Sequence, residues 1–164
     1  MKVAPRRCLG LLLAVAASLA ATQAWPATLT EAQVRAFFAE QQRAWNAGNL
    51  EAYFKGFQPD AVFTDQYRTP AGEIVPYGSS TLAKARVQTH RSRALARISE
   101  TGEVVRIALS ADGRSAQLVS REVSRIQGAK GLRVTCAERR QELILAAGRL
   151  RSKGQTDTYA RCPR

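Results

Sequence analysis

The chain has 164 residues, with 25 Lys and Arg against 13 Asp and Glu, so its formal net charge is +12. This length suits one ordinary domain with a real hydrophobic core and leaves little room for a second one. A basic protein can bind nucleic acid or anionic surfaces, but the charges here are scattered along the chain rather than gathered in runs. The sequence therefore favours a solvated basic surface over a nucleic-acid partner.

The N-terminus has the pattern of a secretory signal peptide. Three basic residues occur among the first seven, an apolar run covers 9–21, and small residues stand at 22–24. We predict a signal peptide over 1–24 and a single domain over 25–164, periplasmic or secreted, with no stable membrane anchor after cleavage. The mature chain loses three basic residues and no acidic one, so its charge is +9. The alternative is a retained membrane anchor, although the run is shorter than the roughly 20 residues of a usual span.

Two helices are predicted at the start of the mature chain. Thr30 and Gln33 form a capping box, and Gly48 provides the left-handed stop. Asn49 can cap a second, short helix, after which Pro59-Asp60 predicts a turn. The first helix buries a stripe at helical spacing: Val34, Phe37, Phe38, Gln41 and Trp45.

The chain then changes from helices to strands. A short strand is predicted over 61–65 and a loop over 66–80, which contains two Pro and two Gly residues. Ser79 or Ser80 would cap a third helix that ends near Arg97. Its buried face would carry Ala83, Val87, His90 and Ala94. Strands separated by turn residues follow over 103–109, 116–126, 132–145 and 150–159. This order predicts an α+β fold in which three N-terminal helices pack on a curved, mostly antiparallel sheet.

Two cysteines remain after signal cleavage, Cys136 and Cys162. A remaining pair in an oxidising compartment is usually a disulfide, which would tie the C-terminal tail to a late strand. Two free thiols are the alternative. No CxxC motif is present, and a metal site is not expected because zinc needs more ligands than one His and two Cys in this arrangement.

The segment Trp45-Asn46-Ala47-Gly48-Asn49-Leu50-Glu51-Ala52-Tyr53, followed by 56–64, resembles the helix–Gly–helix corner and first strand of the nuclear transport factor 2-like superfamily. Asn49 departs from the family's usual Asp, though both residues can cap a helix. The resemblance implies a cone-shaped fold with an apolar pocket at one end and, by analogy, a homodimer. Relatives such as ketosteroid isomerase and scytalone dehydratase place an Asp or a His–Asp pair in that pocket, whereas other relatives only bind or assemble.

Two residues are the tentative catalytic candidates. His90 is the single histidine, and histidine titrates near neutral pH, as a general acid or base must. Asp65 shares a strand face with Ala61 and Phe63, so it could be a buried base with a raised pKa. The alternatives are a structural histidine and an aspartate that merely ends the strand. Asp60 is a weaker candidate than Asp65, because it follows Pro59 and is interpreted as a turn residue.

Further residues complete the predicted site. The ligand pocket would be lined by Trp45, Tyr53, Phe63, Tyr67 and Arg86, although Trp45 and Tyr53 could equally be core residues. Glu122 and Glu138 are interpreted as cross-strand ion pairs on an exposed face. The alternative is that both face inward, where two carboxylates could do acid–base work.

Three functions remain open on this basis. The first is a binder of a small apolar or acidic ligand that needs no cofactor. The second is a cofactor-free isomerase, dehydratase or cyclase in which Asp65 or His90 moves a proton and Tyr67 or Arg86 stabilises an oxyanion. The third is an assembly protein that uses a basic sheet face.

Overall fold

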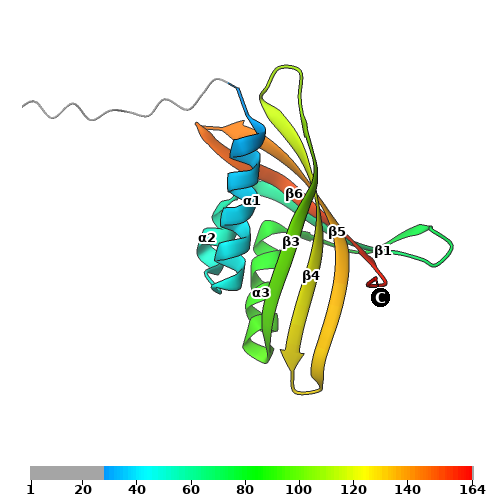
Figure 1. The fold of residues 1–164 in the computed structure, drawn as a ribbon. Coiled ribbons are helices and arrows are strands. Elements are labelled where there is room, and N and C mark those ends of the chain that lie inside the picture. Colours follow the sequence, from blue (N-terminus) through cyan, green and yellow to red (C-terminus); the bar gives the residue numbers. More distant parts are fainter. Residues whose placement is uncertain (1–27, 164) are drawn as a thin grey trace, which may run out of the picture.

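The computed structural model describes residues 28–163. The predicted signal peptide and its cleavage site lie outside these residues. Over the described part of the chain, no helix has both the length and the apolar character that a membrane crossing requires. The described part folds as three helices on one face of a single curved sheet (Figure 1).

Helix α1 (Glu31–Asn46) begins at the predicted capping box, in which Thr30 and Gln33 each accept from the other's backbone N–H. Gly48 takes φ +71°, the left-handed conformation that ends the helix. Helix α2 (Leu50–Lys55) follows at once, capped by the Asn49 side chain. The two helices therefore form the corner that the sequence predicted.

The sheet has six strands in the order β2-β1-β6-β5-β4-β3. All neighbouring pairs are antiparallel except β1 and β6, which run parallel. An α+β architecture with a mostly antiparallel sheet is thus confirmed. The bounds are β1 (Phe57–Arg68), β2 (Ile74–Thr81), β3 (Ala96–Leu109), β4 (Ser115–Gly128), β5 (Gly131–Ala146) and β6 (Arg149–Ala160).

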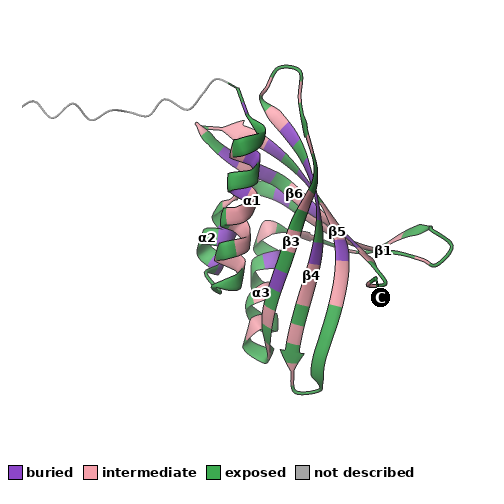
Figure 2. Cartoon of the chain, in the orientation of Figure 1, coloured by how far each residue is buried: buried purple, intermediate pink, exposed green. Residues whose placement is uncertain are grey.

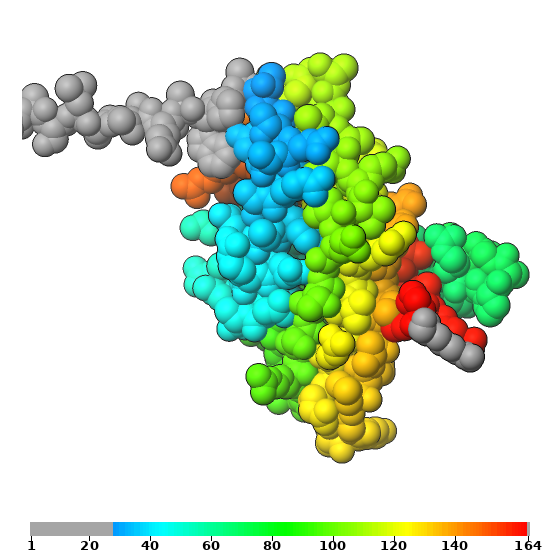
Figure 3. Space-filling view, in the orientation of Figure 1, coloured from blue at the N-terminus to red at the C-terminus, as the bar shows by residue number. Residues whose placement is uncertain are grey.

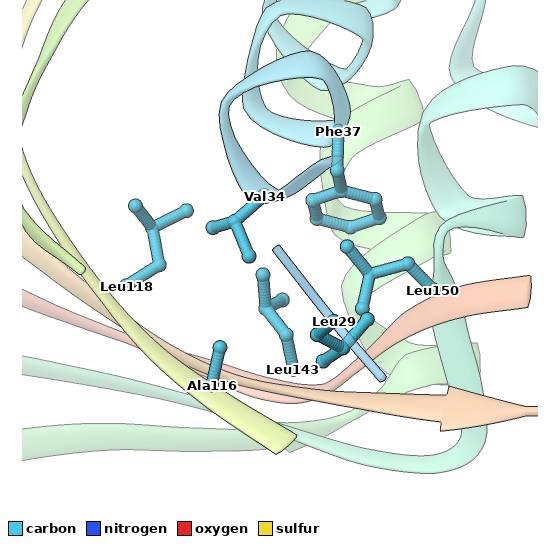
Figure 4. Close-up of a cluster of buried hydrophobic side chains, with 7 residues drawn as sticks. All are labelled: Leu29, Val34, Phe37, Ala116, Leu118, Leu143 and Leu150. Carbon is cyan, nitrogen blue, oxygen red and sulfur yellow. The ribbon is translucent and has the colours of Figure 1, made fainter. Parts of the chain in front are cut away.

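The core is divided into two clusters. The first lies where α1 meets the ends of the long strands (Figure 4), and its members are Leu29, Val34, Phe37, Ala116, Leu118, Leu143 and Leu150. The second joins α2 to β1 and α3, through Leu50, Tyr53, Phe54, Phe57, Ala61 and Ala85. Buried positions concentrate where helices cover the sheet, and the projecting hairpins are mostly exposed (Figure 2).

Two predictions about the first half of the sheet are wrong. Pro59 and Asp60 lie inside β1 and form no turn, because the β1–β6 register shifts between Phe57 and Val62 and a proline is tolerated there. Most of the predicted 66–80 loop is strand. It forms the end of β1 and all of β2, an edge strand in which Pro76 follows a register shift. The hairpin that β1 and β2 form stands out from the body (Figure 3).

Helix α3 (Leu82–Leu95) departs from prediction in its cap and its buried face. Thr81 caps it in place of Ser79 or Ser80. It also lies between β2 and β3, so the helices do not all precede the strands. Its buried residue is Ala85, and the residues of the predicted face, Ala83, Val87, His90 and Ala94, are exposed. The face of α3 that lines the cavity carries Ala85, Gln88, Thr89 and Ser92, so the predicted face lies on the solvent side of the helix.

The disulfide between Cys136 and Cys162 is confirmed, with a Cα–Cα distance of 5.2 Å. It joins β5 to the segment that follows β6, and Cys136 is also paired with Ala160 in the sheet. The bond therefore fixes the end of the last strand to its neighbour.

Candidate functional site: a cavity between the helices and the sheet

A cavity of about 520 Å³ lies between the helices and the concave face of the sheet. Every helix and every strand contributes to its lining, because the side chains that alternate inward along each strand meet under the helices. Its volume is within the usual range of small-molecule sites. Aromatic rings form much of the lining: Trp45, Tyr53, Phe54, Phe63, Tyr77 and Tyr159.

The rings are held by contacts with one another. Tyr53 lies 4.9 Å from Trp45 and 5.4 Å from Phe57 between ring centroids, and Phe57 lies 4.8 Å from Phe63. The Arg93 guanidinium is 4.3 Å from the centroid of Trp45, a cation–π contact that anchors the ring from the α3 side. This part of the wall is therefore preformed rather than assembled by a ligand.

The polar part of the cavity is organised around Arg139 of β5. Its Nε and Nη2 donate to Asp157 at 2.8 and 3.1 Å, and its Nη1 and Nη2 donate to Glu100 at 2.7 and 3.3 Å. Ser124 donates a further bond to Glu100 at 2.9 Å. Burial alone would raise the pKa of Glu100, but Arg139 and Ser124 outweigh it, so the pKa lies below its usual value.

Two more residues extend this network toward α2. Gln155 donates to Asp157 at 2.8 Å and accepts from the Tyr53 hydroxyl at 3.1 Å. Burial raises the pKa of Tyr53, so its hydroxyl stays protonated and serves as a donor. The network fixes the inner end of the cavity in one hydrogen-bonded arrangement.

Behind the cavity is a small inner chamber of about 10 Å³, which shares Trp45, Tyr53, Arg139 and Gln155 with it. Glu122 lines this chamber, is 2 % exposed and accepts from the Ser120 hydroxyl at 2.5 Å. Its Oε2 is buried and has no hydrogen-bond partner among the described residues. Burial raises the pKa of Glu122 to about 7, although Arg139 opposes the shift.

The prediction that Glu122 forms a cross-strand ion pair on an exposed face is therefore wrong. Leu118, Ser120 and Glu122 are two residues apart along β4, so they share the inward face of the strand, and all three are buried. The period-2 pattern of β4 could therefore have predicted that Glu122 is buried. Glu138 does lie on the outer face, but its partner is Arg140 of its own strand at 2.8 Å and not a residue across the sheet.

Asp65 lies where the strand pattern predicted, facing the cavity from β1. It is paired in register with Asp157 of β6. Burial and the negative charge of Asp157 raise the pKa of Asp65, against a smaller opposing effect of a hydrogen bond with Tyr159. Asp60 is exposed and lies outside the cavity lining.

His90 is exposed on the outer side of α3 and does not line the cavity. The structure therefore does not bring Asp65 and His90 together, and a mechanism that needs both in one cavity is not supported.

Of the five predicted pocket residues, Trp45, Tyr53 and Phe63 line the cavity and two do not. Tyr67 is 43 % exposed and lies beside Tyr77, with 6.2 Å between the centroids of the two tilted rings, but it is not part of the lining. Arg86 is exposed and lies over the outer side of Phe54, at 5.6 Å.

Sequence reasoning missed Arg139, Asp157, Glu100, Tyr77 and Tyr159. Arg139 shares its strand face with the buried residues Ala137, Gln141 and Leu143, so alternation could have identified it. Asp157 could not be placed in this way, because the bulge near Gly154 changes which residues of β6 face inward.

Among the described residues, no group of three or more His, Cys, Asp or Glu side chains has an arrangement that could hold a metal ion. The expected homodimer and the expected partner on the basic sheet face stay predictions.

No protein-family model matches the sequence, and no curated protein matches it. Solved structures do match its fold. A ketosteroid isomerase-like protein from Erwinia carotovora atroseptica superposes with a TM-score of 0.63 at 12 % identity, covering 80 % of this chain and 96 % of the other. An NTF-2 like protein of unknown function from Shewanella oneidensis gives 0.58 at 12 % identity, covering 79 % and 99 %. The fold is that of the nuclear transport factor 2-like proteins.

A third neighbour with this fold is the beta subunit of a protein assigned as an aromatic-ring-hydroxylating dioxygenase from Novosphingobium aromaticivorans. Its TM-score is 0.62 at 17 % identity, and the match covers 80 % of this chain and 90 % of the other. The nuclear transport factor 2-like fold thus occurs in an isomerase-like protein and in a subunit of a larger assembly. At these identities the likeness describes the fold alone, and function has to be argued from the cavity.

Proposed function

We propose that this protein binds a small organic molecule in the cavity between its helices and its sheet, without a cofactor and without turnover. The observation that carries the proposal is a cavity of about 520 Å³ whose aromatic wall and inner polar network are held in place by the protein itself. Preformed apolar walls with a few fixed polar groups are the usual features of a ligand site.

The test compares a substitution that narrows the cavity with a matched one that does not. Thr89→Phe places a ring in the cavity from α3, and Ala83→Phe places the same ring on the exposed side of that helix. Fluorescence titration with Nile red, a neutral apolar dye, should show saturable binding to the wild type and to Ala83→Phe. Thr89→Phe should lose it. Equal binding by all three proteins would refute the proposal.

A second function, proton transfer to or from a bound ligand, is favoured by one specific observation. Asp65 faces the cavity, and its raised pKa lets it take up a proton more readily than an ordinary aspartate. Burial also raises the pKa of Tyr159, so its hydroxyl is a protonated donor beside Asp65 that could stabilise an oxyanion. His90 and Tyr67 have no part in this version.

Hydrogen–deuterium exchange tests this second function. A cyclic aryl ketone such as 1-tetralone, incubated in D₂O with the protein, would exchange its α-hydrogens faster than in buffer if Asp65 acts as a base. Asp65→Asn should abolish the acceleration, whereas Asp60→Asn should preserve it. No acceleration by the wild type would leave binding as the function.

We also propose that the protein works in an oxidising compartment outside the cytoplasm. The disulfide between Cys136 and Cys162 and the signal-like N-terminal sequence support this location. N-terminal sequencing of the exported protein should find a mature chain that begins at Trp25. A retained N-terminus on the protein isolated from cells would contradict the proposed cleavage.

A further inference from the structure

The charge of the cavity is opposite in sign to that of the protein. The full chain carries +12, yet the cavity and the inner chamber together are lined by four acidic and two basic side chains. The acidic residues come from four different strands, and one of the basic residues, Arg133, is exposed at the periphery. These residues are Asp65, Glu100, Glu122, Asp157, Arg133 and Arg139.

Of the two basic residues that line these spaces, Arg139 is the less exposed one, and it is already engaged. Arg139 donates four hydrogen bonds to Asp157 and Glu100, and its Nη1 is also 3.9 Å from Glu122. A guanidinium has five N–H donors, so little of Arg139 is free to hold an anionic ligand. An anion that entered would meet this saturated cation and the carboxylates around it.

Asp65, in contrast, forms no ion pair among the described residues, although it faces the cavity. Its register neighbour Asp157 is a second carboxylate on the same side of the sheet. Glu122, 2 % exposed, adds an unpartnered oxygen in the adjoining chamber. A positive charge beside Asp65 would reduce the repulsion between these groups.

Aromatic rings surround the same position. Tyr77 and Tyr159, 6.3 Å apart between centroids, line the cavity with Asp65, and Phe63 and Trp45 line it as well. Ring faces attract cations, and Tyr hydroxyls can accept a hydrogen bond from an ammonium group. Aromatic walls beside a carboxylate that has no ion-pair partner are a suitable site for an organic cation.

We propose that the ligand of this cavity is an organic cation, an ammonium group attached to a flat apolar body, with the ammonium beside Asp65. This inference rests on the proposed binding function and replaces the expected apolar or acidic ligand with a cationic one. The apolar body lies along the aromatic wall, and the carboxylates of β1 and β6 discriminate against anions.

The test uses three probes that share one aromatic body and differ in charge. They are 2-naphthylmethylamine, 2-naphthylmethanol and 2-naphthoate, titrated by calorimetry at neutral pH. The amine should bind about tenfold more tightly than the alcohol, and the carboxylate should bind most weakly. Asp65→Asn should reduce the affinity for the amine to that for the alcohol. Asp60→Asn, which makes the same charge change at an exposed position of β1, should leave the preference intact.

Other outcomes overturn the inference in distinguishable ways. If the alcohol or the carboxylate binds as tightly as the amine, or if Asp65→Asn keeps the preference, the ligand is not selected as a cation. The inference is equally refuted if none of the three probes binds while Nile red does, and the binding function then stands alone. If Nile red also fails to bind, the proposed function is refuted together with the inference.

Discussion

Replacing Glu122 by the neutral isostere glutamine should stabilise the protein at alkaline pH. Burial raises the pKa of this carboxyl from 4.5 to about 7, even though Arg139 is near enough to oppose the shift. The folded state therefore binds the Glu122 proton more tightly than the unfolded state does. It follows that this group's contribution to stability is full below about pH 4.5 and is lost as pH rises toward about 7.

The magnitude follows from the width of that window. A difference of one pKa unit corresponds to about 1.36 kcal/mol, so the change from 4.5 to about 7 corresponds to roughly 3 kcal/mol. Glu122→Gln has no charge to bury and keeps an oxygen that can accept from Ser120. The variant should thus be more stable than the wild type by up to about 3 kcal/mol near pH 8, with the advantage vanishing near pH 4.

Urea denaturation of both proteins at the two pH values measures this difference. Glu138→Gln is the matched control, since Glu138 lies on the outer face of the neighbouring strand and pairs with Arg140. Its effect should remain below about 1 kcal/mol at either pH. The reasoning would be refuted if Glu122→Gln were destabilising by the same amount at both pH values, because Glu122 would then act as an ordinary paired carboxylate.

Three further predictions concern stability. Arg139→Met leaves Asp157 and Glu100 buried without their cation and should destabilise the fold by about 3–5 kcal/mol; a loss below 1 kcal/mol in urea denaturation would show that the network is solvated. Gly102→Ala should destabilise by about 1–3 kcal/mol because its methyl group would overlap Glu122 and Phe38, whereas Gly128→Ala, with its nearest neighbour at 3.7 Å, should remain within about 0.5 kcal/mol. Replacing both cysteines of the disulfide, 26 residues apart, by alanine should destabilise by about 3.5 kcal/mol, and a reducing agent should bring the wild type to the same midpoint without affecting the variant.

Local chemistry made the helical corner predictable from sequence. The Thr30 capping box, Gly48 and Asn49 each affect only backbone groups a few residues away in the sequence. All three have the predicted role. The long strands of the second half were also recognisable, because turn residues separate them. The edge strand β2 was not, since Pro76 and Gly78 are typical of loops and become acceptable in a strand only through a register shift at a sheet edge.

The candidate site was less predictable because it depends on contacts between distant strands. Asp65 could be assigned to the cavity from its own strand pattern. The Arg139 network could not be predicted, because Glu100, Asp157 and Arg139 lie on different strands of one sheet. Bringing them together depends on the register of those strands, which the sequence alone does not reveal. His90 was misplaced because the more apolar face of α3 was expected to be buried, whereas the face that lines the cavity carries Gln88, Thr89 and Ser92.

The parallel pairing of β1 with β6 has a consequence for how the chain reaches this fold. The Gln66 side chain bonds to Thr158, 92 residues later, and β1 has no other neighbour on that side of the sheet. Such non-local pairing closes a long loop, so it slows folding and must come late. In a chain that still lacks β6, the β1–β2 hairpin is not hydrogen-bonded to the other strands, and the cavity lacks the part of its wall that β6 provides. The sheet therefore stays incomplete until β6 has been synthesised and has paired with β1.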